Sequence, residues 1–148
     1  MYGVTPIGYP AGEKSGVDIK LREQVKGDER LPAWSLFFDR SFSTPLSMND
    51  QKLSDILKTV RWAPSAANMR PWRIVKDGDK FHFYERHTKQ YDAENYGDVQ
   101  KLDMWIALCH FMSVTDGKLT ISDPDLDTPE NTEYIATVCI GIAAQIGR

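Results

Sequence analysis

Residues 61–73, R-W-A-P-S-A-A-N-M-R-P-W-R, constrain the folding of this chain more than any other segment. Its two prolines disfavour a continuing helix and a central strand, so the segment is predicted to be a loop. Small alanines let a backbone approach a flat ligand closely, and Arg70 and Arg73 supply forked, permanently charged donors. We therefore expect a loop that holds a flat polar group. The alternative is a rigid helix-to-strand connection pinned by Trp62 and Trp72.

The residues before this loop predict a helix, and the residues after it predict a β-hairpin. Apolar residues recur at helical spacing before the loop, at Leu53, Ile56, Leu57 and Val60. Ser47 is the expected N-cap, with Asp50 three positions on in a capping-box-like arrangement. Pro64 ends this helix. After the loop, residues 72–76 and 80–84 flank D-G-D, which indicates two antiparallel strands joined by a tight turn.

The second half of the chain predicts another helix and two further strands. Residues 99–114 are apolar around most of a helix, which is typical of a helix buried in a domain centre or at a subunit interface. Residues 118–121 and 134–140 read as strands, whereas residues 92–97 and the acidic run 123–130 read as loops. This order of elements predicts an α+β class.

The first 46 residues predict an irregular lead-in to the single domain of residues 1–148. Residues 4–10 are short and apolar and could form a strand. Residues 12–30 are polar and glycine-rich, so we expect a surface loop with at most a weak helical turn. Residues 31–38 are too apolar for a free linker and should dock on another surface. The structured part is expected over residues 47–148.

Composition excludes several classes of function. The net charge of -3 lacks the basic excess of generic nucleic-acid binding. No run approaches the roughly 18 apolar residues of a membrane span, and the N-terminus does not resemble a signal peptide. Cys109 and Cys139 both lie in apolar runs, which predicts buried free thiols. We therefore expect a cytoplasmic protein that binds neither nucleic acid nor membrane.

Titratable clusters in the sequence give no clear catalytic or metal site. His82 and His87 flank Glu85, but His82 and Glu85 point to opposite faces of a strand, so we predict no metal there. His110 beside Cys109 is not a nucleophile pair, because helical neighbours do not face each other. No catalytic side chain and no metal ligand is assigned from these patterns.

The loop carries a family resemblance. W-A-P-S-A-A-N-M-R-P-W-R, residues 62–73, resembles the A-P-S-x-x-N-x-Q-P-W loop of the nitroreductase family of FMN flavoproteins. The preceding helix, residues 45–61, and the hairpin, residues 73–84, are similar to their counterparts in that family. L-D-M-W-I-A-L-C-H-F, residues 102–111, resembles the family's central helix, which packs across a dimer. Together these stretches span residues 45–84 and 102–111.

The resemblance implies a fold and a set of flavin-binding residues. The fold is a central antiparallel sheet flanked by helices, with FMN held non-covalently between two halves. Pro64, Ser65 and Asn68 match loop positions that line the flavin ring. Arg70 stands where the family often has Gln, and the added cation favours an anionic reduced flavin. Arg40 is the remaining match to the family's R-R-S-x-R phosphate cluster.

The chain also departs from the family pattern. The stretch that corresponds to the arginine cluster reads L-F-F-D-R-S-F, in which Phe37 and Phe38 cannot bind phosphate. The glycine-rich loop and the late basic residue of the family are not recognisable. We therefore expect a partial copy of the full fold, resembling the C-terminal part of a longer, roughly duplicated protein. The missing N-terminal half would carry the phosphate-binding arginines.

Two functions remain open from the sequence. In the first, the chain is an FMN-dependent oxidoreductase that reduces nitro or quinone-like acceptors with NADH or NADPH, as a homodimer or with a complementary N-terminal half. In the second, it is a truncated half that binds no flavin alone and acts as a structural or partner-binding domain. A third reading is a small α+β binding protein whose loop is only a staple.

Overall fold

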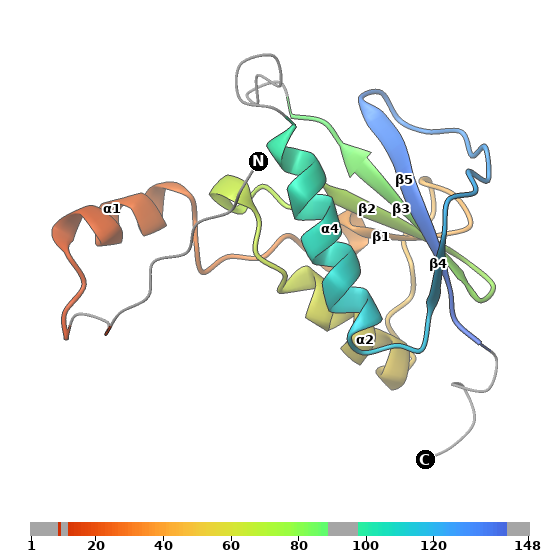
Figure 1. The fold of residues 1–148 in the computed structure, drawn as a ribbon, viewed down its shortest axis with the longest axis horizontal. Helices are drawn as coiled ribbons and strands as arrows, with labels where there is room; N and C mark the ends of the chain where they lie inside the picture. Colours follow the sequence, from red (N-terminus) through yellow and green to blue (C-terminus); the bar gives the residue numbers. More distant parts are fainter. Residues whose placement is uncertain (1–8, 10–11, 89–97, 142–148) are drawn as a thin grey trace.

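The computed structural model describes residue 9, residues 12–88 and residues 98–141 (Figure 1). The elements in chain order are α1 (Gly16–Gln24), the short 3-10 helix η1 (Ala33–Ser35), β1 (Phe37–Asp39), α2 (Gln51–Arg61), the 3-10 helix η2 (Ala66–Asn68), β2 (Trp72–Asp77), β3 (Lys80–Arg86), α4 (Val99–Met112), β4 (Lys118–Thr120) and β5 (Thr132–Cys139). The predicted α+β class is confirmed. The predicted loop at 92–97 and, apart from residue 9, the predicted strand at 4–10 lie outside the described residues.

The strands form one five-stranded sheet in the order β1-β2-β3-β5-β4. The predicted hairpin is confirmed, because β2 and β3 pair in antiparallel register from Trp72 with Glu85 to Asp77 with Lys80. Gly78 in the hairpin turn has φ 60°, a conformation that glycine adopts without steric cost. β5 pairs antiparallel to both β3 and β4, whereas β1 runs parallel to β2. The sheet is thus mainly antiparallel with one parallel edge strand.

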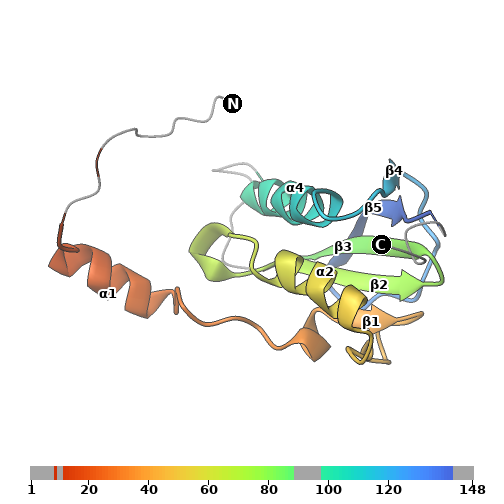
Figure 2. The ribbon, with the colours of Figure 1, turned by 90° about the horizontal axis from the view of Figure 1, so that it is seen from below.

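The hydrophobic core lies between the sheet and the helices α2 and α4, which pack against each other (Figure 2). The predicted apolar stripe of α2 is confirmed, since Leu57 and Val60 are fully buried in this core. Phe111 of α4 contacts two sheet residues, with ring centroids 4.8 Å from Phe81 and 5.4 Å from Phe83. Burial of these side chains supplies the main force that holds α4 on the sheet.

Two local expectations for the first half of the chain are wrong. The N-cap of α2 is Asp50, not Ser47, because the Asp50 carboxylate accepts a hydrogen bond from the Leu53 backbone N–H at 3.1 Å. The segment 1–46 is not irregular throughout, since it contains α1 and β1. A capping box between Ser15 and Asp18 begins α1, which has no buried residue and lies apart from the sheet (Figures 1 and 2).

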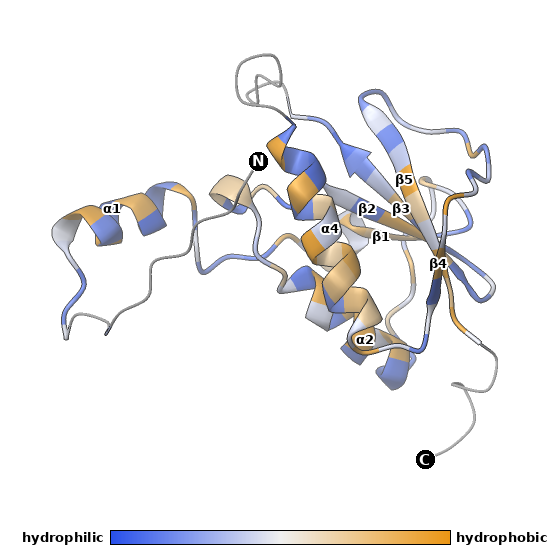
Figure 3. Cartoon of the chain, viewed as in Figure 1, coloured by the Kyte–Doolittle hydropathy of each residue, from blue (hydrophilic) through white to orange (hydrophobic). Residues whose placement is uncertain are grey.

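The helix α4 is not buried on all sides within this chain. One side packs on the sheet, while Leu102, Trp105 and Met112 remain exposed on the other. Figure 3 shows apolar colouring along most of the helix. Cys109 is also exposed and Cys139 is half-buried, so the prediction of two buried thiols is wrong. The sequence predicted this helix to lie in a domain centre or at a subunit interface. Burial in a domain centre alone does not explain its exposed apolar side.

Residues 12–88 and 98–141 contain no helix that is both long enough and apolar enough to cross a membrane.

We expect Leu57→Ala to lower the free energy of unfolding by about 2–5 kcal/mol, because it leaves a cavity in a fully buried site. Lys52→Ala, on the exposed side of α2, is the matched control and should change stability by no more than about 0.5 kcal/mol. Urea denaturation of both variants measures this difference. Equal stability of the two variants would contradict the assigned core.

Candidate functional site

The segment between α2 and β2 is a tightly wound loop. After α2 ends at Arg61, the chain passes through η2 and enters β2 at Trp72 (Figure 1). Ala67, Asn68 and Arg70 have φ values of 45°, 61° and 48°. Such left-handed conformations of residues other than glycine cost on the order of 1–3 kcal/mol each and persist only where the surroundings hold them. The contacts that hold this loop therefore define the candidate site.

Asp103 of α4 holds the loop backbone at Ala66. Its carboxylate oxygens accept hydrogen bonds from the Ala66 backbone N–H at 3.0 and 3.1 Å. The Asp103 residue is 4% exposed. This burial raises the pKa of Asp103, and the hydrogen bond from Ala66 partly opposes that rise. Sequence reasoning did not assign Asp103, although a lone carboxylate within an apolar helix was the available signal.

Ser65 offers a hydrogen-bond donor at this loop. Its hydroxyl oxygen accepts from the Arg70 backbone N–H at 2.9 Å, which closes the loop on itself. Within the described parts of the chain, no acceptor for the Ser65 O–H is found. Ser65 is half-buried, and the adjacent Pro64 is exposed. A hydroxyl donor therefore lies next to the exposed ring of the preceding proline.

The Asn68 side chain is engaged within the chain. Its Nδ2 donates to the backbone oxygens of Val25 and Lys26, at 3.1 and 2.6 Å. Its Oδ1 accepts from the Arg70 guanidinium. The amide therefore holds residues 25–29, which follow α1, against the loop. A ligand that uses this amide has to displace those backbone contacts.

Arg70 is a buried cation in a cluster of arginines. The residue is 2% exposed, and its guanidinium donates to the backbone oxygens of Glu29 and Asn68 at 2.8 and 3.2 Å. Burial lowers the pKa of Arg70 to about 10, and repulsion from Arg30 and Arg61 lowers it further in the same direction. No carboxylate among the described residues lies within ion-pair distance of Arg70. The loop therefore carries an uncompensated positive charge.

Arg40 does not lie at this loop. It is exposed at the end of β1, and its backbone N–H donates to Lys76 O at 2.8 Å. The loop enters β2 at Trp72, four residues earlier, which is roughly 13 Å along a strand. Within one chain the structure thus brings together Pro64, Ser65, Asn68 and Arg70, and it places Arg40 at the other end of the sheet.

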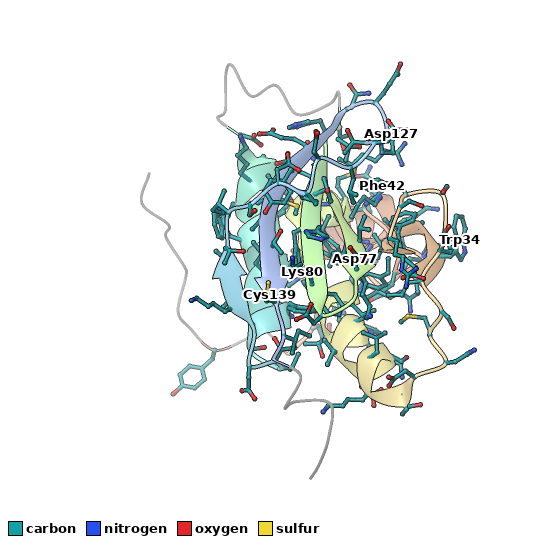
Figure 4. All side chains as sticks on the ribbon, turned by 90° about the vertical axis from the view of Figure 1, so that its right-hand side faces the viewer. Trp34, Phe42, Asp77, Lys80, Asp127 and Cys139 are labelled. Atoms are coloured by element: carbon teal, nitrogen blue, oxygen red, sulfur yellow. The ribbon has the colours of Figure 1, made fainter. Side chains whose placement is uncertain are left out.

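A separate pocket of about 370 Å³ lies at Arg73, which alternates in β2 with the core residues Trp72 and Ile74 and so faces away from α2 and α4. It is lined by Trp34, Ser35, Phe38, Phe42, Pro45, Arg73, Arg86, Pro129 and Thr132. Figure 4 shows Trp34 and Phe42 on this side of the molecule. Burial lowers the pKa of Arg73 to about 10, and repulsion from Arg86 acts in the same direction. Arg73, expected as a donor of the loop, therefore belongs to this pocket instead.

We expect a pH dependence that comes from Asp103. Because its pKa is raised in the folded state, the folded chain holds this proton more tightly than the unfolded chain. The stability of the wild type relative to Asp103→Asn should therefore be highest below about pH 4 and should fall as pH rises above it. Urea denaturation across pH measures this difference.

Asp127→Asn, at an exposed position, is the control for the loss of one negative charge. Suppose that the free energy of unfolding of the wild type increased, relative to that of Asp103→Asn, as pH rises. The pKa of Asp103 would then not be raised in the folded state, and the assigned burial would be wrong.

Comparison with known proteins identifies the family. The family model described as "Putative TM nitroreductase" matches residues 3–115, a stretch that contains the loop, the hairpin and α4. No curated protein and no solved structure matches the chain. Because the match covers well over half of the chain, this protein belongs to the family of that description, a nitroreductase family.

Proposed function

We propose that this member of the nitroreductase family is an FMN-dependent oxidoreductase that reduces nitro or quinone-like acceptors with hydride from NADH or NADPH. The observation that carries the proposal is the Ser65 hydroxyl next to the exposed Pro64 ring, whose O–H has no acceptor among the residues that the structure describes. This donor sits in a strained loop that Asp103 fixes in place. Strained and fixed backbone of this kind is concentrated at ligand sites in general.

The chemistry of the donors fits a flavin in two respects. The Ser65 O–H suits a carbonyl or nitrogen acceptor at the edge of a planar ring. The Arg70, Arg30 and Arg61 charges lie close enough together to depress the pKa of Arg70, and they suit an anionic ring or phosphate. When bound, FMN supplies the hydride chemistry, and the protein supplies orientation and electrostatics.

Each residue of the loop has a defined task in this proposal. Ser65 orients the ring edge, Pro64 walls one face, and Arg70 favours negative charge on the ring through its field. Asp103 is a positioning residue, because it holds the backbone of Ala66 and does not face the ligand. No side chain is assigned as a general acid, since water can supply the proton.

A second copy of this chain is the partner that we propose for the exposed side of α4. Leu102, Trp105, Cys109 and Met112 follow one another at spacings of three and four residues, so they form one continuous stripe. A complementary N-terminal half is the other partner that fits the same stripe. We further propose a cytoplasmic location, which the two free cysteines favour.

Two observations favour the alternative of a half that binds no flavin alone. The Asn68 amide is held by residues 25–29, and Arg40 lies at the far end of the sheet. In this alternative, the chain serves as a structural or partner-binding domain. A colourless protein that stays colourless at saturating FMN, yet dimerises, would favour it.

We expect the purified chain to bind FMN and Ser65→Ala to weaken that binding roughly fivefold, which corresponds to the loss of about 1 kcal/mol for one hydrogen bond. Ser47→Ala is the matched control, because Ser47 is exposed and lies before α2. Quenching of flavin fluorescence gives the dissociation constants. Equal affinity of Ser65→Ala and the parent, with Ser47→Ala unchanged, would remove Ser65 from the site.

We expect Trp105→Ala to shift the chain from dimer to monomer, because this side chain is the largest in the α4 stripe. Trp34→Ala is the control, since Trp34 is even more exposed but lies on the other face of the sheet. Light scattering after size exclusion measures the mass of each variant. A dimer that survives Trp105→Ala but not Trp34→Ala would contradict the proposed interface.

A further inference from the structure

The end of β3 meets the beginning of α4 in a cluster of charged side chains outside the loop. Glu85 lies in β3 opposite Trp72 of β2, at the same end of the sheet as the loop. Successive residues of a strand alternate between faces, so Glu85 follows Phe81 and Phe83 onto the side that α4 covers. Asp98 is the N-cap of α4, at the matching end of that helix.

The Glu85 carboxylate is buried and accepts no hydrogen bond from residues 12–88 or 98–141. Its side chain is 0% exposed, and both oxygens lack a hydrogen-bond partner in those ranges. Burial raises the pKa of Glu85, and repulsion from Asp98 acts in the same direction. A buried carboxylate in this condition is costly unless a cation or donor compensates it. His87 Nδ1 is 3.1 Å away and is charged only when protonated, so the Glu85 carboxylate is placed to share a cation with His87 and Asp98.

The His87 ring is oriented as a ligand rather than as a donor to Glu85. His87 Nε2 forms a hydrogen bond of 3.1 Å with Oε2 of Glu133. A carboxylate only accepts, so Nε2 is the donor to Glu133, and the neutral tautomer that keeps this proton has a lone pair on Nδ1 for a metal ion. Nδ1 lies 3.1 Å from Oε1 of Glu85, but this contact lacks the angle of a hydrogen bond. The lone pair and the carboxylate thus face a shared space.

We propose that Glu85, His87 and Asp98 bind one divalent transition-metal ion of the zinc type. One ligand atom from each of the three residues lies within 4.8 Å of the others. A tetrahedral ion with bonds of about 2.1 Å holds its ligand atoms roughly 3.4 Å apart, so small side-chain rotations complete the set. One imidazole nitrogen with two carboxylates suits zinc or cobalt better than magnesium or calcium, which prefer oxygen ligands alone.

The residues around His87 resemble those around metal-binding histidines in other proteins. Glu133 accepts a hydrogen bond from Nε2 of His87, the ring nitrogen that would not bind the metal, and so fixes the ring. At many zinc sites a carboxylate plays this role for a ligating histidine. Lys101 lies 3.5 Å from Asp98 and 3.7 Å from Glu133 and is half-exposed, so it compensates part of the negative charge from outside. Three protein ligands leave a fourth position for water or another ligand.

The test uses Co²⁺ as a spectroscopic probe and Zn²⁺ as its competitor on the chelator-treated chain. We expect one equivalent of Co²⁺ to give visible absorption typical of a tetrahedral site, and Zn²⁺ to abolish it. His87→Ala should weaken Co²⁺ binding by roughly a hundredfold, and Glu133→Gln by roughly tenfold to a hundredfold. His87 is 40% exposed, so this variant should fold even if Glu85→Gln does not.

His110→Gln is the matched control, because His110 neighbours the exposed Cys109 and lies outside the cluster. Unchanged Co²⁺ affinity in His87→Ala, loss of binding in His110→Gln, or no binding by the parent chain would each overturn the proposal. Displacement of Co²⁺ by equimolar Mg²⁺ would contradict the assignment of the His87 imidazole as a ligand, because Mg²⁺ prefers oxygen ligands. All titrations are made without FMN, so a failure of flavin binding leaves the metal result unaffected.

Discussion

The packing of α4 on the sheet is the constraint on which the rest of the structure depends. Phe111 packs against both Phe81 and Phe83, and this contact helps to fix the position and rotation of α4 on the sheet. The same rotation directs Asp103 toward Ala66 and places Asp98 near Glu85. One hydrophobic contact surface therefore positions both the loop of the flavin proposal and the cluster of the metal proposal.

Among the described residues, the buried carboxylates and the buried guanidinium group are concentrated at one end of the molecule. Asp103, Arg70 and Glu85 are almost fully buried, and all three lie where α4 begins and the loop enters β2. Buried charges reduce stability unless they are paired, so a chain gains nothing in folding from gathering them there. The opposite end of the core, around Leu57 and Phe111, contains no buried carboxylate or guanidinium group among the described residues. This asymmetry separates the part that stabilises the fold from the part suited to bind a ligand.

Local patterns predicted the elements after residue 46, but they missed α1 and β1 and were insufficient for the sites. The α2 stripe and the D-G-D turn depend on neighbours a few residues apart, and the structure has both. The helix start was misplaced because Ser47 and Asp50 are both good caps, and only Asp50 reaches the backbone of Leu53. The partners of Asn68 could not be predicted, because Val25 and Lys26 lie more than 40 residues away in sequence.

Strand alternation could have grouped part of the charged cluster, but in the sequence analysis it was applied to His82 and Glu85 and not to Glu85 and His87. His82 and Glu85 do lie on opposite faces of β3, and His82 bonds to Thr137 on the other side. Glu85 and His87, two residues apart, share a side, which strand periodicity alone would predict. Asp98 and Glu133 join them only through the tertiary fold. Half of such a site is therefore visible in sequence, and the other half is not.

The contacts between residues 25–29 and the Asn68 amide would affect both the affinity and the association rate of a ligand that uses this amide. A ligand that needs this amide can bind only to the fraction of molecules in which the covering segment has lifted away. Its apparent dissociation constant equals the intrinsic one divided by that fraction, so a rarely lifted segment makes a good site look weak. Association should then become independent of ligand concentration once lifting limits the rate. Changes in residues 25–29, far from the ligand in sequence, would tune occupancy without altering a single group that touches it.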